Sequence, residues 1–271
     1  MLRSLLRTPD HLVNPRPHDM LKPPLRSLAA VLLFCVVGAA CEQPDPAMEA
    51  VRSSIEAHGG DLFEAMEARF TFRDAHFTVW RQDGAFRYER VYTDEGGSVI
   101  REWMTNQETG REVDGEPRPL TAQERAAVET AVNSVVYFGF LPFRLLDDAA
   151  RHRDLGTTEF EGRTYRKVEV TFEQEGGGAD WEDRFVYWFD DQEHTLDYLA
   201  YRYYRDGGGT RFRRAVNRRN VGGLLLQDYE NYTAAAGEVD DIADYDRLAA
   251  RGELQLVSTI PLEGVEVRDL R

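Results

Sequence analysis

Residues after position 40 carry nucleophilic and acid–base side chains, but their spacing matches no catalytic motif. The serines in this region, at positions 53, 54, 98, 134 and 258, all lie outside a Gly-x-Ser-x-Gly sequence. Carboxylates are frequent throughout this acidic chain, so spacing alone does not pair any two of them as acid and base. The sequence therefore favours a protein that is not an enzyme.

Metal and phosphate sites are also not indicated. The histidines after position 40 are His58, His76, His152 and His194, and none has a second His or Cys at metal-ligand spacing. The acidic segments 180–183 and 240–246 do not follow the EF-hand pattern. The glycine triplets 176–178 and 207–209 lie between predicted strands, which is typical of hairpin tips. We expect no metal and no cofactor.

Residues 1–40 have the character of a leader with a secretion signal, whether translation begins at Met1 or Met20. Lys22 and Arg26 precede an apolar stretch of about ten residues at 28–37. A membrane span needs roughly 20 apolar residues, so this stretch is too short to be one. The sequence Val-Gly-Ala-Ala-Cys41 resembles the bacterial lipobox, in which the cysteine is lipidated. The alternative is an ordinary signal peptide with Cys41 as a bystander.

If Cys41 carries the lipid anchor, the residue after it bears on location. Glu42 follows Cys41, whereas an Asp at this position tends to retain enterobacterial lipoproteins at the inner membrane. We therefore expect the periplasmic face of the outer membrane. Residues 41–46 form a short lipidated tether, and residues 47–271 form one domain because no linker of boundary length interrupts them.

The charge of the chain excludes one class of partner. It has 48 acidic and 33 basic residues, for a formal net charge of −15, so a nucleic-acid surface would have to overcome repulsion from phosphate. The one basic cluster comprises residues 211–214 and 218–219. Two interpretations of it stay open: contact with anionic lipid headgroups, or balance of the acidic surface.

The order of apolar patterns predicts an α+β fold. Helical spacing begins at Pro46 and ends near His58, and a second short helix runs to about Glu67. Thr121 and Glu124 have the spacing of a capping box at the start of a further helix, and a last helix covers 245–251. Strand patterns fill most of the rest, so we predict a single curled antiparallel sheet of about ten or eleven strands. Such a sheet forms a half-closed barrel with helices packed on its concave face.

Two segments are candidates for a ligand cavity. The strand 184–189 is apolar on both faces, so both faces must be covered. Neighbouring loops could cover the second face, or it could line a cavity. The apolar segment 135–143 could be core or a mobile lid. The expected lining or lid residues are Val135, Phe138, Phe140, Leu141, Phe143, Val168, Val170, Phe172, Tyr187 and Phe189.

The hairpin motifs occur in an order that resembles the LolA/LolB superfamily of periplasmic lipoprotein carriers. They are Asp83-Gly84 with Tyr88, Gly162 with Tyr165 to Val168, Tyr187-Trp188-Phe189-Asp190, and Gly222-Gly223-Leu224. A closer resemblance, carried by residues 133–143 and 175–178, is to an uncharacterised group of lipoproteins from Bacteroidetes-type bacteria. The superfamily resemblance implies a cavity between curled sheet and helices that shelters acyl chains.

Two functions are consistent with these patterns. The first is an anchored lipoprotein that binds a lipid or another amphiphile in the half-barrel. The second is an interaction or sensing protein whose filled barrel presents its outer face to an envelope protein. No catalytic residue is assigned in either case.

Overall fold

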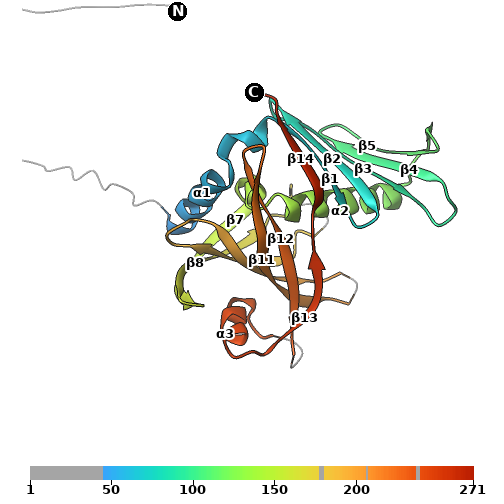
Figure 1. Ribbon diagram of the computed structural model, residues 1–271. Coiled ribbons are helices and arrows are strands. Elements are labelled where there is room, and N and C mark those ends of the chain that lie inside the picture. The colour runs from blue at the N-terminus through green and yellow to red at the C-terminus, as the bar shows by residue number, and fades with distance from the viewer. Residues whose placement is uncertain (1–44, 177–179, 206, 236–238) are drawn as a thin grey trace, which may run out of the picture. The chain divides into compact units, whose positions relative to one another are not determined.

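The computed structural model describes residues 45–176, 180–205, 207–235 and 239–271, and shows an α+β fold dominated by antiparallel strands (Figure 1). In these residues, fourteen strands form two sheets of seven strands each, together with three α-helices. Neither sheet closes on itself, so the predicted class of α+β fold with an open, curled antiparallel sheet is confirmed. Contacts within Gln43–Arg271 make this part of the chain one compact unit. The predicted signal peptide and Cys41 lie outside the described residues.

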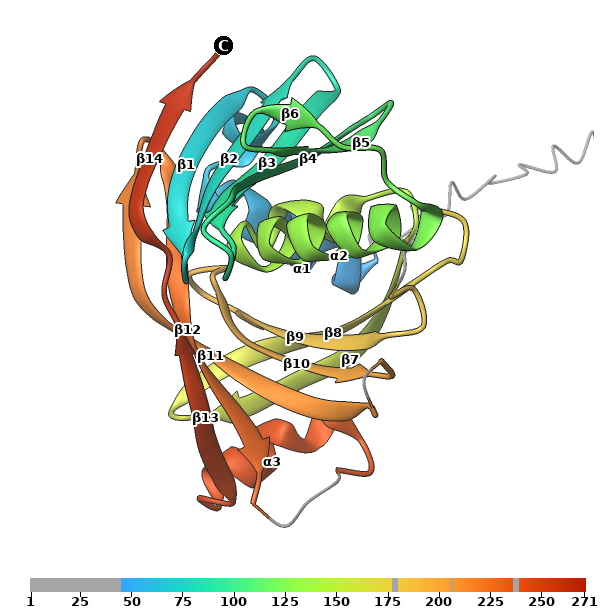
Figure 2. The same cartoon turned by 90° about the vertical axis from the view of Figure 1, so that its right-hand side faces the viewer.

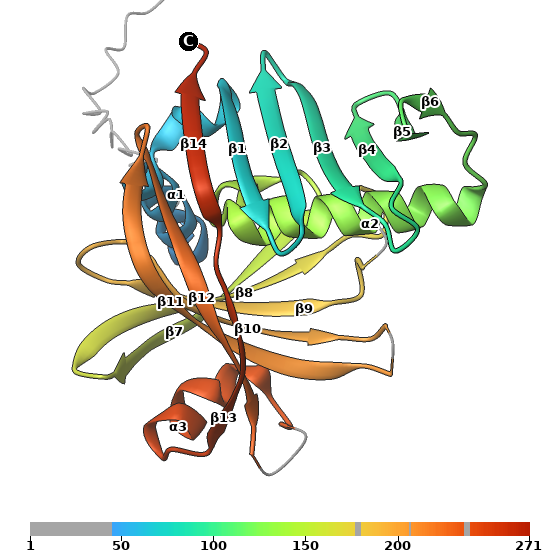
Figure 3. The ribbon, with the colours of Figure 1, turned by 45° about the vertical axis from the view of Figure 1, so that its right-hand side comes forward.

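The first sheet contains the N-terminal strands and the last strand of the chain, which lie side by side in Figure 3. A two-residue turn at Asp83 and Gly84 joins β2 to β3, and both residues have positive φ, 50° and 76°, as a type I′ hairpin requires. In spatial order the strands are β14 (Glu263–Asp269), β1 (Met66–Phe72), β2 (Ala75–Gln82), β3 (Ala85–Thr93), β4 (Val99–Thr105), β5 (Thr109–Val113) and β6 (Glu116–Pro117).

The second sheet contains the described strands that follow the second helix, except the last strand of the chain. Every neighbouring pair is antiparallel. In spatial order the strands are β13 (Leu254–Ile260), β12 (Leu224–Ala234), β11 (Gly209–Val221), β10 (Leu196–Tyr203), β9 (Arg184–Asp190), β8 (Arg163–Phe172) and β7 (Ala150–Phe160). The chain then crosses to the first sheet between β13 and β14 through Pro261 and Leu262.

The strand count and the division into two sheets differ from the sequence prediction of one sheet with ten or eleven strands. The unpredicted strands are β5, β6 and β7. Strand β7 is rich in charged residues and mostly exposed or half-buried along its length, so it has no alternation of apolar residues. Strands β5 and β6 are short and polar. Hydrogen bonding to neighbouring strands, rather than side-chain burial, forms these three strands.

Helix α1 (Pro46–His58) packs on the concave face of the second sheet. The Asp45 side chain accepts a hydrogen bond from the Ala47 amide at 3.0 Å, and Pro46 suits the first helical position because it needs no backbone donor. Ala47 and Val51 are fully buried against the apolar side chains of β8 and β9. After Gly59, a 3-10 helix (η1, Gly60–Glu64) leads into β1, where the sequence predicted a helix to about Glu67.

His58, at the end of α1, is fully buried and makes stability depend on pH. Its Nδ1 lies 2.8 Å from the Ser54 carbonyl oxygen, and burial lowers the pKa of His58 to about 4, with a further lowering from Arg218. The unfolded chain therefore binds a proton below pH 6.5 that the folded chain does not bind until about pH 4. Stability should fall across this window by up to roughly 3 kcal/mol.

Chemical denaturation of the wild type and His58→Gln between pH 7.5 and pH 4 measures this effect. The wild type should lose more stability than the variant as the pH falls from about 6.5 to about 4. Asp183, whose pKa burial raises to about 6, changes stability in the opposite direction but equally in both proteins. Parallel curves for the two proteins would show that His58 is not the titrating group.

Helix α2 (Ala122–Gly139) lies between the two sheets, as Figure 2 shows. It begins with the predicted capping box: the Thr121 hydroxyl accepts from the Glu124 amide, and the Glu124 carboxylate accepts from the Thr121 amide. Val128, Val132 and Val136 face the first sheet, whereas Tyr137 packs on the second. The 3-10 helix η2 (Phe143–Leu146) follows. Helices therefore cover the concave faces, as predicted.

The opposite face of the second sheet is covered by a 3-10 helix (η3, Ile242–Asp244) and helix α3 (Tyr245–Ala250). Val186 and Trp188 of β9 are fully buried on this face. Both faces of β9 are thus covered by packed elements, α1 and α2 on one side and η3 and α3 on the other. The second face of this strand is therefore covered by neighbouring segments and does not line a cavity.

Candidate functional site

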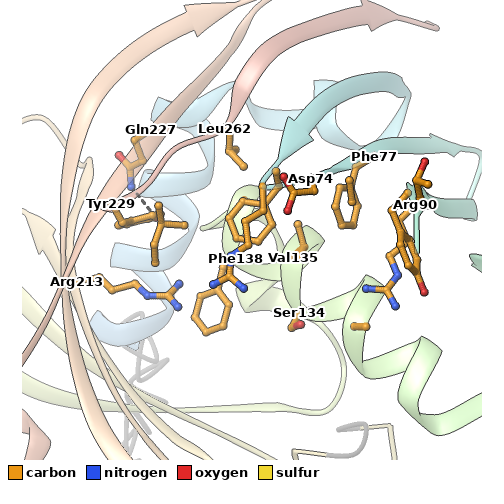
Figure 4. A pocket seen from close by; sticks show the side chains of 18 residues that line it. Asp74, Phe77, Arg90, Ser134, Val135, Phe138, Arg213, Gln227, Tyr229 and Leu262 are labelled. Carbon is orange, nitrogen blue, oxygen red and sulfur yellow. Dashed lines mark hydrogen bonds between the residues drawn. The ribbon is translucent and has the colours of Figure 1, made fainter. Parts of the chain in front are cut away.

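A cleft of about 540 Å³ lies between α2 and the strands of the two sheets (Figure 4). Segments far apart in the sequence meet there: the β1–β2 hairpin, the end of β3, the second half of α2, β11, β12 and the β13–β14 link. The lining residues are Phe72, Arg73, Asp74, Ala75, Phe77, Arg90, Tyr92, Thr93, Ala131, Ser134, Val135, Phe138, Gly139, Arg213, Gln227, Tyr229, Ile260 and Leu262.

Part of the cleft wall is apolar and rigid. Phe77 is buried and stacks on Phe70 with ring centroids 5.3 Å apart. Leu262 is buried where the chain crosses between the sheets, and Val135 and Phe138 project from α2. Because these side chains are held by the packed cores behind them, the apolar wall is formed before any ligand arrives.

The polar part of the wall carries more positive than negative charge. Three arginines, Arg73, Arg90 and Arg213, line the cleft with one acid, Asp74. The Arg90 guanidinium is paired with Glu102, with Nη2 and Oε2 2.6 Å apart. Arg213 is only 8% exposed and points from β11 toward the Phe138 ring (Figure 4).

Neutral hydrogen-bonding groups complete the lining. The Gln227 amide donates to the Tyr229 hydroxyl and to the Leu196 carbonyl, both at 2.9 Å. Burial raises the pKa of Tyr229 to about 12, so its hydroxyl keeps its proton at neutral pH. The Ser134 hydroxyl donates to the Thr130 carbonyl of its own helix at 2.7 Å. These groups can orient a polar ligand atom by hydrogen bonding.

Two of the sequence-predicted lining residues, Val135 and Phe138, line this cleft. Phe140, Leu141 and Phe143 are buried in the packed cores, and the Phe143 ring stacks on Phe63 at a centroid distance of 4.7 Å. The segment 135–143 is thus divided: its helical part reaches the cleft, and its last residues lie in the core.

The remaining predicted residues pack on the concave face of the second sheet. Tyr187 shares a hydrogen bond of 2.6 Å with Tyr137 of α2, between the two hydroxyls. The side chains that share this core with α1 and do not line the cleft are Val168, Val170, Phe172, Tyr187 and Phe189. Cys41 lies outside the described residues.

Sequence reasoning missed most of the polar cleft residues. Arg213 belongs to the basic cluster 211–214, and strand alternation places Arg213 and Arg211 on one face and Phe212 on the other. The burial of Phe212 under α3 makes the Arg213 face the concave one. The signal that could have identified Arg213 was therefore present, but the sequence did not show which face was concave.

Within the described parts of the chain, no three His, Cys, Asp or Glu side chains cluster as metal ligands would. The histidines of this region also lie outside the cleft lining. None of the described helices combines the length and the apolar character that crossing a bilayer requires.

A family model matches residues 29–261 of the sequence, which is most of the chain. This chain belongs to the DUF6503 family. The family is described as one of unknown function, in agreement with the resemblance to an uncharacterised group of lipoproteins. A comparison with curated proteins found no match.

Several solved structures are similar to this DUF6503 chain. A LolA superfamily protein from Nitrosomonas europaea has a TM-score of 0.45 and 11% identity, over 83% of this chain and 94% of that one. A DUF1329 family protein from Desulfovibrio piger has a TM-score of 0.43 and 12% identity, over 82% and 93%. For the lipoprotein LppX of Mycobacterium tuberculosis the values are 0.28 and 13%, over 60% and 89%.

The resemblance to the LolA superfamily, first indicated by the hairpin motifs, is therefore found again among solved structures. At these TM-scores the similarity carries no argument about ligand or activity.

Proposed function

We propose that this chain is a lipid-anchored protein of the cell envelope that holds a lipid or another amphiphile in the cleft, without catalysing a reaction. The observation that carries the proposal is the cleft of about 540 Å³ with one apolar wall and one polar wall. Sites for small organic ligands commonly have volumes of about 300–1,000 Å³. A ligand with an apolar chain and a polar head matches both walls.

The energy of burial supports this choice of ligand. Each methylene removed from water contributes about 0.8 kcal/mol, so six or seven of them approach micromolar affinity before the costs of association. Phe77, Val135 and Leu262 provide apolar contacts for such a chain. The proposal needs no nucleophile or base, in keeping with a Ser134 hydroxyl that is already bonded within its helix.

Filling the cleft should abolish binding. Ala131 and Val135 lie one helical turn apart on α2 and both line the cleft, so the double variant Ala131→Trp/Val135→Trp places two indoles in it. Loss of room for as few as two methylenes lowers affinity roughly tenfold. Displacement of an apolar fluorescent probe measures the effect in protein carrying Cys41→Ser, which removes the lipid anchor.

The matched control is Ala126→Trp, which adds an indole to an exposed position on the side of the same helix away from Ala131 and Val135. It should bind the probe like the parent protein. Circular dichroism confirms that each variant is folded before binding is compared. Equal probe affinity in the double variant and the parent would exclude this cleft as the ligand site.

The anchor is proposed from the sequence alone. We infer that Cys41 is lipidated and holds the protein at the periplasmic face of the outer membrane, since an apolar stretch at 28–37 and Gly-Ala-Ala precede it and Glu42 follows it. Wild type expressed with labelled palmitate should incorporate the label and sediment with outer membranes. Cys41→Ser should do neither. Equal labelling of the two proteins would exclude Cys41 as the anchor.

One observation favours the second candidate, an envelope interaction protein. Strand β13 is the edge of the second sheet, and its Leu256 and Val257 are 50% and 51% exposed. An exposed edge strand with apolar side chains can pair with another chain. To test this possibility, the proteins that the wild type captures from envelope extracts are compared with those that Leu256→Lys/Val257→Lys captures. A partner lost only in the variant would support it, and identical pull-downs would count against it.

A further inference from the structure

Arg213 is a buried cation without an acidic partner. Its side chain is 8% exposed, and in the described parts of the chain no carboxylate forms an ion pair with it. Arg90, the other well-shielded arginine of the cleft, is paired with Glu102. Burial of an ionised group is expensive unless an opposite charge or hydrogen bonds compensate it. The Arg213 guanidinium therefore lacks an opposite charge, which an anionic ligand could supply.

The hydrogen bonds of Arg213 are incomplete as well. One Nη2–H donates to the Tyr201 hydroxyl at 2.9 Å. The Nε–H is buried and has no acceptor among the described residues. A guanidinium presents several N–H donors in one plane, a geometry that matches the two oxygens of a carboxylate or phosphate.

Aromatic rings fix the position of this guanidinium at the cleft. It lies 4.0 Å from the centroid of the Phe138 ring and 5.1 Å from that of Tyr201. Phe138 also belongs to the apolar wall, so the cation lies directly beside that wall (Figure 4). Stacking holds the planar group in one orientation before a ligand binds.

We propose that Arg213 receives the anionic head of the ligand, so that the cleft selects single-chain amphiphiles with a carboxylate or phosphate head over neutral ones. This inference rests on the proposed function, because the apolar wall must hold the tail. The chain has a net charge of −15, so it does not attract anions non-specifically. Selectivity for an anion must then come from a local cation such as Arg213.

Paired ligands test the role of the head. Calorimetric titration of the Cys41→Ser protein compares decanoate, which has tail and anion, with decanol, which has the tail alone. Hydrogen bonds to a charged group are expected to make decanoate bind roughly 10- to 100-fold more tightly than decanol. In Arg213→Met this preference should disappear, with decanol affinity retained.

The matched control is Arg211→Met. Arg211 lies two residues away on the same face of β11, stacks on Tyr203, and does not line the cleft. It changes the net charge equally and should leave the preference for decanoate intact. Thermal unfolding of each variant is measured alongside, because a merely structural Arg213 would lower the melting temperature without changing the ratio of the two affinities.

The outcomes separate the two claims. If the parent protein binds decanoate and decanol equally, or if Arg213→Met keeps the preference, the role of Arg213 is overturned while the proposed function stands. If the parent protein binds neither ligand and no apolar probe, the proposed function itself fails. Acetate and inorganic phosphate form the third arm. If either of them binds as tightly as decanoate, the cleft is a site for free anions, and the proposal that Arg213 binds the head of an amphiphile is overturned.

Discussion

Trp188→Ala is expected to lower the free energy of unfolding by roughly 3–5 kcal/mol, because it removes a large side chain from a core that cannot collapse around the loss. Trp188 is fully buried on β9, on the face covered by η3 and α3. Its ring meets that of Phe212 edge-on, with centroids 5.8 Å apart. Its Nε1–H donates to Asp246 at 3.3 Å. Urea denaturation at neutral pH measures the change.

Trp188→Phe is the matched control, since it keeps an aromatic ring and loses the hydrogen bond to Asp246. Its expected loss is smaller, roughly 1–2 kcal/mol. Ligand affinity of the folded variants should equal that of the parent, because Trp188 lies on the face of the sheet away from the cleft. A loss below about 1 kcal/mol in Trp188→Ala would contradict the close packing of α3 on this sheet.

Glu102→Ala is expected to cost about 3 kcal/mol, because it leaves two arginines without their shared carboxylate. Glu102 is fully buried on β4, directly between Arg90 of β3 and Arg111 of β5. Its Oε1 lies 2.6 Å from Nη2 of Arg111, and its Oε2 lies 2.6 Å from Nη2 of Arg90. Denaturant unfolding measures the loss. Arg90 lines the cleft, so freeing it should also raise affinity for decanoate.

Glu89→Ala is the matched control on the adjacent strand. Glu89 also lies between two arginines, Arg87 and Arg101, but these are 38% and 41% exposed. An ion-pair cluster so open to solvent contributes little, so its loss should cost about 1 kcal/mol or less. Equal losses for the two variants would show that burial of Glu102 adds nothing to its interactions.

The sequence was sufficient for local elements whose signals are local. The Thr121–Glu124 capping box and the Asp83-Gly84 turn are set by neighbouring residues, and both form as predicted. Strand β9 could also be predicted, as could its coverage on both faces. Strands β5, β6 and β7 could not, because hydrogen bonds to neighbouring strands hold them and their side chains follow no apolar pattern.

The site was less accessible from the sequence than the fold. Val135 and Phe138 belong to an apolar segment that stands out, and both line the cleft. The other lining residues come from several strands that meet only when the two sheets curve around α2. Arg213 illustrates the limit: its charge suggested the surface, whereas strand alternation combined with the position of α3 turns it inward.

Native mass spectrometry of the Cys41→Ser protein, purified without detergent, tests the central claim most directly. The account predicts that the protein carries the added mass of one small amphiphile, which organic solvent extracts. The fraction of protein with this mass should be smaller in Ala131→Trp/Val135→Trp, and added decanoate should replace the amphiphile. The account would be contradicted if the protein has the bare polypeptide mass, does not retain added decanoate and does not bind an apolar probe.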